Sequence, residues 1–269
     1  MPSLERHRTR GVTLLCDPEA VGGVTFGFSE RSGGVSEGPY ESLNLGGRCG
    51  DDPARVAENR RRALAALGAE DDAERLVCPH QVHGTHVVTV RSAAPDELAR
   101  ARAEAAAGAD VVVCAAAHVP VLLCFADCVP VVLVAPGGLA VAHSGWRGTL
   151  SHVAAVAARA LVAATGADPA ELLAYVGPHV GPADYEVSPE LAARFADEFG
   201  PGALAGERNL DLAWCVRAAL AEAGVAAPQV ATCEDSTTSC PERFFSYRAS
   251  GGRCGRHGAL AVLCDGAHS

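Results

Sequence analysis

The sequence predicts an α/β protein in which a mixed sheet is enclosed by helices. Four short apolar runs in the middle of the chain are rich in β-branched residues: GADVVVC, HVPVLLCF, VPVVLVA and GLAVAH. Short, continuous apolar runs of this kind are typical of strands that are buried on both faces. Helical patterns flank these runs, and 49% of the 269 residues are hydrophobic, enough to bury a substantial core. We therefore expect residues 1–269 to form a single domain.

Capping residues mark where the helices begin. Asp52 offers an N-cap with Pro53 at the first helical position, so PARVAENRRRALAAL is predicted to be a helix. Further helices are predicted over 95–107, over 147–165, from Ser188-Pro189 onward and over 211–224; Asp168 and Glu171 fit a capping box for a short helical turn. Further strands are predicted at 12–16, 24–29, 76–78, 87–90, 172–177, 229–233 and 258–264.

Charge and hydropathy exclude several classes of function. The formal net charge is −10, which argues against a nucleic-acid-binding or anionic-membrane-binding surface. Every basic residue is arginine, and without lysine neither Schiff-base chemistry nor a P-loop is available. Any anion must therefore meet arginine or backbone amides. The longest apolar run, 119–135, is interrupted and too short to span a bilayer, and the N-terminal segment lacks a signal-peptide core, so we expect a cytoplasmic protein.

The chain has 11 cysteines. Without an export signal this number favours free thiols, most of them buried as small apolar side chains. Cys233 and Cys240 flank a polar loop, and the sequence leaves open whether they approach each other or a functional site. His7 and His268 lie near the ends of the sequence, where exposure to solvent is expected.

Three segments combine a metal-binding residue type with a turn: PHQVHGTH, FADCVP and AHSGWRG. Each has an ordinary structural interpretation, because a single histidine near a strand end is more often hydrogen-bonded than metal-bound. Residues three apart on a strand point to opposite faces, so His80, His83 and His86 cannot all meet one ion. None of the three segments identifies a site alone.

Six strings, in this order along the chain, closely resemble the YfiH, or polyphenol oxidase laccase-domain, family. They are NLGGRCGDDPARVAENRRRAL, QVHGTHVV, FADCVPVVL, AVAHSGWRGTL, YVGPHVGPADYEV and RFFSYR. The likeness covers residues 44–263. It implies a layered α/β/β/α fold with mixed β-sheets. It also implies one zinc ion held by His83, Cys128 and His143. Such a donor set leaves a coordination position open, as in catalytic zinc sites, and lowers the pKa of a bound water.

The family is described as phosphorolysing adenosine, inosine and methylthioadenosine and as deaminating adenosine. We therefore expect purine nucleosides and phosphate as small-molecule substrates. Phosphorolysis needs an oriented phosphate, for which Arg147 is the first candidate, Arg48 the second and Arg60 the third. Asp127 is either a proton carrier in catalysis or a turn-forming residue. Trp146 either packs or faces a purine.

The chain departs from the family pattern at three positions, one of which is the additional cysteine Cys240. Arg48 stands where relatives commonly carry the histidine of N-L-G-x-H, which affects either phosphate binding or proton transfer. AHSGWRG replaces AHAGWRG, so a serine lies beside His143.

Other functions use the same residues. Cys128 could be a nucleophile activated by His143 or His83, in an amide or cell-wall-precursor hydrolase. A copper phenol oxidase is disfavoured because the sequence has no His-x-His pair, although Cu²⁺ could occupy the same three residues in place of Zn²⁺. A non-enzymatic metal-holding module is disfavoured by the open coordination position and by the neighbouring arginine. The oligomeric state is left open.

Overall fold

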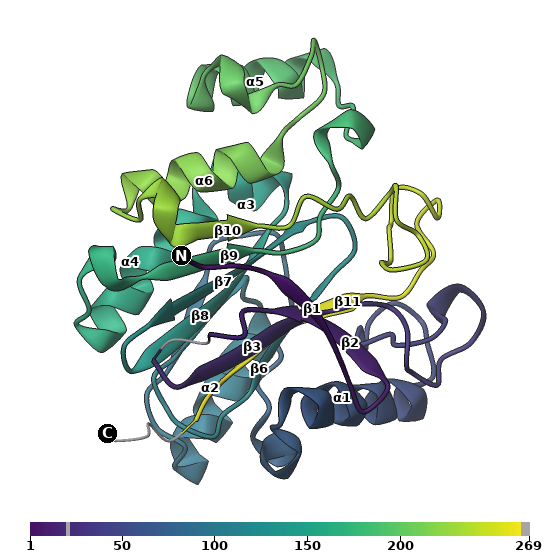
Figure 1. Ribbon diagram of the computed structural model, residues 1–269, viewed down its shortest axis with the longest axis vertical. Helices are drawn as coiled ribbons and strands as arrows, with labels where there is room; N and C mark the ends of the chain where they lie inside the picture. Colours follow the sequence, from purple (N-terminus) through teal and green to yellow (C-terminus); the bar gives the residue numbers. More distant parts are fainter. Residues whose placement is uncertain (20–21, 265–269) are drawn as a thin grey trace.

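The computed structural model describes residues 1–19 and 22–264. Two sheets lie face to face, and helices cover their outer faces (Figure 1). This is the layered α/β/β/α arrangement that the family resemblance implies. The single mixed sheet predicted from the apolar runs is instead two sheets, of which one is mixed. His7 is exposed as expected, and His268 lies outside the described residues.

The first sheet has the strand order β1-β2-β3-β11-β6, and all neighbouring strands are antiparallel. Its strands are β1 (Glu5–Thr9), β2 (Val12–Cys16), β3 (Val24–Ser29), β6 (Val121–Phe125) and β11 (His257–Leu263). The sequence analysis missed β1, because all five of its residues are exposed and only backbone pairing with β2 holds it. Strand β11 lies between β3 and β6.

The second sheet is mixed, with the order β10-β9-β7-β8-β5-β4. The pairs β9–β10 and β4–β5 are parallel and the others antiparallel. Its strands are β4 (Val87–Val90), β5 (Val111–Cys114), β7 (Val129–Ala135), β8 (Gly138–Ser144), β9 (Leu173–Val176) and β10 (Val230–Thr232). Every residue of β5, β7 and β8 is buried, as predicted from their continuous apolar composition.

The strand predicted at 76–78 is wrong in extent. Only Val77 pairs, in an isolated parallel bridge with Val121 of β6. Pro79 has no N–H and restricts the residue before it, so the ladder cannot continue.

The helices are α1 (Pro53–Leu67), α2 (Pro95–Ala107), α3 (Trp146–Leu150), α4 (Val153–Thr165), α5 (Pro189–Phe199) and α6 (Leu212–Glu222). The predicted caps hold: the side chains of Asp52 and Ser188 accept from backbone N–H groups of α1 and α5, and Asp168 and Glu171 form a capping box. The continuous helix predicted over 147–165 is wrong. It breaks at His152, whose φ of 53° lies in the left-handed region, so α3 and α4 are separate.

Three apolar clusters hold the layers together. The first lies between the sheets and includes Phe26, Phe28 and Val141. The second packs α4 and α6 against the outer face of the second sheet, and the third packs α1 against the first sheet. Cys233 and Cys240 both belong to the cluster between the sheets, Cys240 at its margin.

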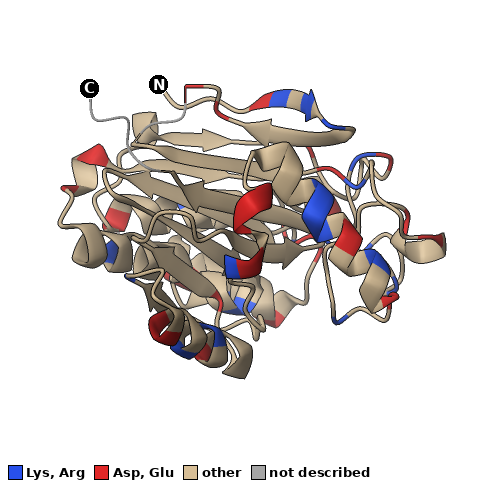
Figure 2. Ribbon diagram, turned by 90° about the horizontal axis from the view of Figure 1, so that it is seen from below, with Lys and Arg blue, Asp and Glu red and all other residues tan. Residues whose placement is uncertain are grey.

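Charged residues lie on the helices, the loops and β1, with both signs interspersed, while the strands in the interior carry almost none (Figure 2). In the part of the chain that the structure describes, none of the helices has the length and apolarity that a bilayer span needs.

Candidate functional site

Strand pairing brings His143 next to a buried carboxylate. The β5–β8 register aligns Val111 with Ala142, so Asp110, just before β5, lies opposite His143. The His143 N–H donates to the Asp110 carbonyl at 2.8 Å, and Nδ1 of His143 lies 2.7 Å from Oδ1 of Asp110. Both residues are buried. Because Asp110 engages Nδ1, Nε2 of the His143 ring is left available.

The same carboxylate holds the loop that carries His83. The backbone N–H groups of Val82, His83 and Gly84 donate to Asp110 at 3.2, 2.9 and 2.6 Å. His83 adopts a φ of 62°, a conformation that a non-glycine residue keeps only when its surroundings impose it. Asp110 therefore positions both histidines.

Cys128 lies in the turn that leads from β6 in the first sheet to β7 in the second. Asp127 forms this turn with a φ of 87°. Its carboxylate accepts from Oγ1 of Thr237 and from the backbone N–H of Arg248, both at 2.7 Å. Its carbonyl accepts from the N–H of Val180 at 3.0 Å. Both carboxylate oxygens of Asp127 are thus engaged, an arrangement that suits the turn-forming interpretation better than a free proton carrier.

These elements bring His83, Cys128 and His143 together. One donor atom from each lies within 4.8 Å of the others, and Sγ of Cys128 is 3.9 Å from Nε2 of His83. Gly145 allows this approach, since a Cβ there would lie 2.8 Å from the His83 ring and 3.0 Å from the Cys128 sulfur. His86 instead contacts Glu104 at 2.9 Å, so it lies apart from the cluster.

Ser144, the departure from the family string, has a defined place. Its Oγ is 2.7 Å from Oγ1 of Thr149, which in turn donates to the Gly145 carbonyl at 3.0 Å. All of these groups are buried. The serine hydroxyl therefore braces the turn beside His143.

The cluster forms a charged pair backed by a carboxylate. Burial opposes ionisation of the Cys128 thiol, but the His143 imidazolium and hydrogen bonds from His143 and His83 outweigh it and lower the pKa of Cys128 to about 6. Burial also opposes charge on His143, yet Cys128 and Asp110 raise its pKa to about 9. Burial likewise favours neutral Asp110, but hydrogen bonds from His143, Gly84 and His83 keep its pKa below the usual range. A thiolate of this kind is a metal ligand or a nucleophile.

The cluster opens into a cavity of about 1070 Å³, near the upper end of small-molecule sites. Trp146, Tyr185 and Tyr247 supply aromatic surface to its wall. Burial, with the Cys128 and Asp127 charges, raises the pKa of Tyr185 to about 12, so its hydroxyl keeps its proton at neutral pH.

Four arginines line the cavity: Arg48, Arg60, Arg248 and Arg256. In the described part of the chain none of them forms an ion pair with a carboxylate. The guanidinium carbons of Arg248 and Arg256 lie 5.0 Å and 5.6 Å from the ring centres of Tyr185 and Tyr247. Their positive charge is thus left for an anion, in a protein whose net charge is −10.

The structure separates the three arginines that the sequence analysis nominated. Arg48 and Arg60 line the cavity, whereas Arg147 is exposed, is not part of the lining, and lies over the Trp146 ring at 4.3 Å. Arg147, the first candidate for binding phosphate, therefore lies outside the cavity lining, whereas the second and third candidates belong to it.

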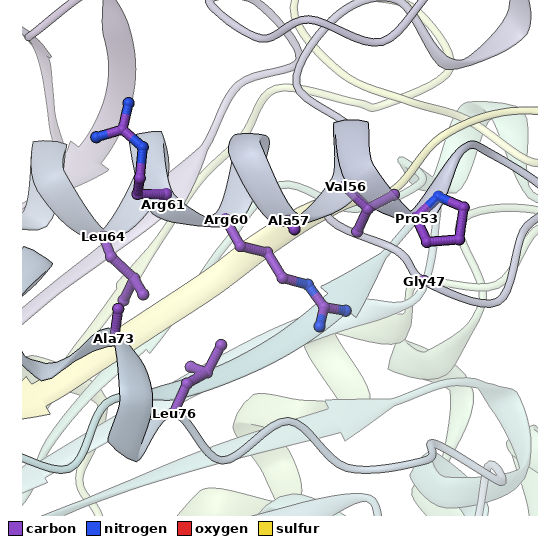
Figure 3. A pocket seen from close by; sticks show the side chains of 9 residues that line it. All are labelled: Gly47, Pro53, Val56, Ala57, Arg60, Arg61, Leu64, Ala73 and Leu76. Atoms are coloured by element: carbon purple, nitrogen blue, oxygen red, sulfur yellow. The ribbon is translucent and has the colours of Figure 1, made fainter.

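A smaller cavity of about 300 Å³ lies beside α1 (Figure 3). Arg60 and Arg61 point from α1 in different directions, and Arg60 lines both cavities. Nε of Arg60 donates to the Leu45 carbonyl at 2.9 Å, which fixes the base of its guanidinium between the two cavities.

Sequence reasoning missed several residues of this site. Asp110 carried a usable signal, because an acidic residue directly before a fully apolar strand must find partners when it is buried. Tyr185 stood inside a quoted family string without a role. Arg248 is the last residue of the string RFFSYR, but the sequence assigned it no role. Arg256 lies beyond that string, gave no signal and reaches the cavity only through the fold.

Fold and site together define a two-sheet α/β/β/α protein with one His–Cys–His cluster at the end of an arginine-lined cavity. A family model described as multi-copper polyphenol oxidoreductase laccase matches residues 25–264. The chain belongs to this family, the YfiH family of the sequence analysis. A protein of Deinococcus radiodurans named purine nucleoside phosphorylase is 39% identical over 259 residues, 94% of each chain.

Two solved structures share the fold. The crystal structure of YlmD from Geobacillus stearothermophilus superposes with a TM-score of 0.84 at 30% identity and covers 98% of this chain and 100% of its own. That of the Bacillus licheniformis hypothetical protein YfiH has a TM-score of 0.85 at 28% identity and covers 96% and 98%.

Proposed function

We propose that this protein is a zinc-dependent purine nucleoside phosphorylase, which transfers the ribosyl group of a purine nucleoside to phosphate. The observation that carries the proposal is the convergence of the His–Cys–His cluster and four unpaired arginines on one cavity. The name of the Deinococcus relative supports the reaction class. Adenosine, inosine and methylthioadenosine are the proposed substrates, with adenosine deamination as an accompanying activity.

Zinc fits the donor set. His83, Cys128 and His143 offer two imidazole nitrogens and one thiolate within 4.8 Å of one another, which suits a tetrahedral ion with one position left for water or substrate. Asp110 supports this assignment, because metal-binding histidines commonly donate their other ring nitrogen to a carboxylate. When bound, the ion supplies Lewis-acid activation.

Copper occupies such donor sets readily, so Cu²⁺ is an alternative occupant. The arrangement does not suit a laccase. The described residues contain only one such cluster. The chain's single methionine, Met1, is fully exposed and cannot act as the axial ligand that blue-copper sites use.

The arginines suit the anionic co-substrate. Arg48 and Arg60 would hold phosphate as charged hydrogen-bond donors. Neither forms an ion pair within the described residues, and the Leu45 carbonyl engages only Nε of Arg60. Arg147 is the weaker candidate, because it lies outside the cavity lining. Phosphate held in this way competes with water for the ribosyl carbon, which favours phosphorolysis over hydrolysis.

The aromatic residues suit a neutral purine nucleoside. Tyr185 and Tyr247 offer flat surfaces for a base, and the protonated hydroxyl of Tyr185 is a hydrogen-bond donor to a ring nitrogen of the leaving purine. We assign Asp127 to positioning, because its carboxylate ties the Cys128 turn to Thr237 and Arg248. All eleven cysteines are free, which supports the cytoplasm as the location.

The test is to incubate inosine and adenosine with the purified protein, with and without phosphate, and to follow free base and ribose 1-phosphate. We expect base release that depends on phosphate and that His143→Ala abolishes. Base release at the same rate without phosphate, or full turnover by the His143 variant, would refute the assignment.

One observation favours a second candidate, a cysteine hydrolase. Cys128, His143 and Asp110 lie in the order of a nucleophile, a base and an orienting carboxylate. Zinc content separates the two. A stoichiometric ion that protects Cys128 from iodoacetamide supports the phosphorylase, whereas a metal-free, rapidly alkylated Cys128 supports the hydrolase.

A further inference from the structure

A second pair of thiols lies on the wall of the large cavity, apart from the His–Cys–His cluster. Cys78 and Cys124 both line the cavity and pack against the same apolar cluster, and their side chains are close enough to interact. The proposed phosphorolysis uses neither residue. A reactive cysteine becomes a reversible oxidation site when a second, resolving cysteine is within reach.

The backbones on both sides of this pair are fixed. Next to Cys78, the Val77 N–H donates to the Pro120 carbonyl at 2.8 Å, and the Leu122 N–H donates to the Val77 carbonyl at 3.0 Å. Both bonds tie the segment before Pro79 to the β6 region. The backbones that carry the two thiols are therefore fixed relative to each other by the fold.

Gln81 adds a second tie. Its amide nitrogen donates to the Cys124 carbonyl at 2.7 Å, and its amide oxygen accepts from the Cys124 N–H at 2.8 Å. Gln81 follows Cys78 by three residues, so both ends of this short segment are bonded to β6. The segment that carries Cys78 is thus tied at both ends to the strand that carries Cys124.

Two cavity arginines polarise the pair. Nε of Arg60 donates to the Leu45 carbonyl at 2.9 Å, and Sγ of Cys124 lies 3.5 Å from the same oxygen, which places Arg60 beside the thiols. The hydrogen bond from Cys124, followed by the Arg60 and Arg48 charges, outweighs burial and lowers the pKa of Cys78 to about 7. The hydrogen bond to Cys78 and burial raise the pKa of Cys124. Cys78 is thus the sulfur that ionises first, and Cys124 is the one that keeps its proton.

We propose that Cys78 and Cys124 form an oxidation site for hydroperoxides in the wall of the cavity, with Cys78 as the attacking thiol and Cys124 as the resolving thiol. The Cys78 thiolate attacks one oxygen of hydrogen peroxide. The S–O bond forms, the O–O bond breaks, and hydroxide leaves and takes up a proton as water. The Cys78 sulfur loses two electrons and becomes a sulfenic acid, and the peroxide is reduced.

The Cys124 thiol then gives up its proton and attacks the sulfenic sulfur. The S–S bond forms, the S–O bond breaks, and hydroxide leaves and takes up that proton as water. In sum, two thiols and one hydrogen peroxide give one disulfide and two water molecules. A dithiol reductant reverses the change by thiol–disulfide exchange through the open cavity.

The test treats the zinc-loaded protein with a small excess of hydrogen peroxide and maps cross-linked peptides by mass spectrometry. Cleavage after arginine places Cys78 in the peptide 76–91 and Cys124 in the peptide 103–147, and further cleavage after Phe125 separates Cys124 from Cys128. We expect one dominant cross-link, between Cys78 and Cys124, that dithiothreitol removes. The mapping involves no nucleoside turnover, so its outcome is independent of the proposed function.

Three variants sharpen the result. Cys124→Ser keeps a hydroxyl donor for Cys78 but cannot form the disulfide, so peroxide should leave a sulfenic acid on Cys78 that dimedone captures. Cys78→Ser should abolish the cross-link. Cys49→Ser is the matched control: Cys49 lines the same cavity, its sulfur contacts Asn44 and Gly46, and its loss should leave the cross-link unchanged.

The alkylation rate of Cys78 provides a second readout. In Cys124→Ala the pKa of Cys78 should rise toward the ordinary value of about 8.5. The thiolate fraction at pH 7 then falls about 16-fold, while intrinsic nucleophilicity rises about fivefold, so alkylation should slow about threefold. A dominant cross-link elsewhere, no cross-link at all, or a Cys78 rate unaffected by Cys124→Ala would overturn the proposal.

Discussion

Replacing Asp110 with asparagine tests how the proposed metal centre is held. The side chain keeps its size but loses one acceptor. If the amide nitrogen takes the place of Oδ2, it faces the N–H groups of Gly84 and Val82; if it takes the place of Oδ1, it faces Nδ1 of His143 and the N–H of His83. Either orientation sets donor against donor and removes two hydrogen bonds to a charged acceptor.

The expected magnitude follows from those contacts. Each hydrogen bond to a charged group contributes about 1.5–3 kcal/mol, so the loss of two in Asp110→Asn should lower the free energy of unfolding by roughly 3–6 kcal/mol. Loss of a carboxylate that orients a metal-binding histidine typically weakens metal affinity 10–100-fold. That range corresponds to about 1.4–2.7 kcal/mol of binding free energy.

The assay is competition for zinc against a chromophoric chelator, together with urea unfolding of the zinc-free protein. Asp17→Asn is the matched control. Asp17 is buried and accepts from Ser3, Glu19 and Tyr175 away from the cavity, so its loss should reduce stability and leave zinc affinity unchanged. If Asp110→Asn bound zinc with wild-type affinity, the positioning role of Asp110 would be wrong.

Four further results are expected. Gly145→Ala should weaken zinc binding at least tenfold, because the new Cβ would lie 2.8 Å from the His83 ring; equal affinity in the same chelator assay would contradict this. In initial-rate kinetics, Arg48→Gln and Arg60→Gln should each raise the KM for phosphate about tenfold, whereas Arg147→Gln should leave it unchanged. A raised KM in Arg147→Gln alone would restore Arg147 as the phosphate residue. Burial of Glu30 opposes its ionisation, but hydrogen bonds from Arg6 and Arg243 outweigh burial and keep the pKa of Glu30 low. The stability that Glu30 contributes is therefore complete above its unfolded pKa of about 4.3 and is lost as pH falls through the lower folded pKa. Glu30→Gln should make the free energy of unfolding, measured in urea between pH 7 and pH 3, fall less steeply with acid. We propose that residues 1–269 are one domain, so calorimetry should give a single transition, and two separate transitions would count against it.

Local sequence patterns were sufficient for most of the fold. The buried strands β7 and β8 are continuous apolar runs, and the N-caps Asp52 and Ser188 follow from side-chain chemistry within a few residues of each helix. Strand β1 could not be predicted in this way. Its exposed residues carry no apolar alternation, and it exists because β2 offers an edge.

Some residues of the candidate site could likewise be predicted from the sequence, and others could not. His83, Cys128 and His143 stand in short strings that family resemblance connects, and the structure gathers them. Asp110, before an apolar strand, and Arg248, in the string RFFSYR, stood at recognisable places, but only strand register and loop packing bring them to the site. Arg256 depends on packing between distant segments, which no local pattern reveals. Arg147 is the opposite case, because it is close to His143 in the sequence but its side chain is not part of the cavity lining.

The position of β11 has a consequence for how the chain reaches this structure. Strand β11 (His257–Leu263) separates β3 from β6, although β6 ends at Phe125. During synthesis, both neighbours therefore present unpaired edges while more than half of the polypeptide is still being added, and such edges invite intermolecular pairing. Shortening the chain before residue 257 should therefore yield aggregates rather than a smaller folded unit.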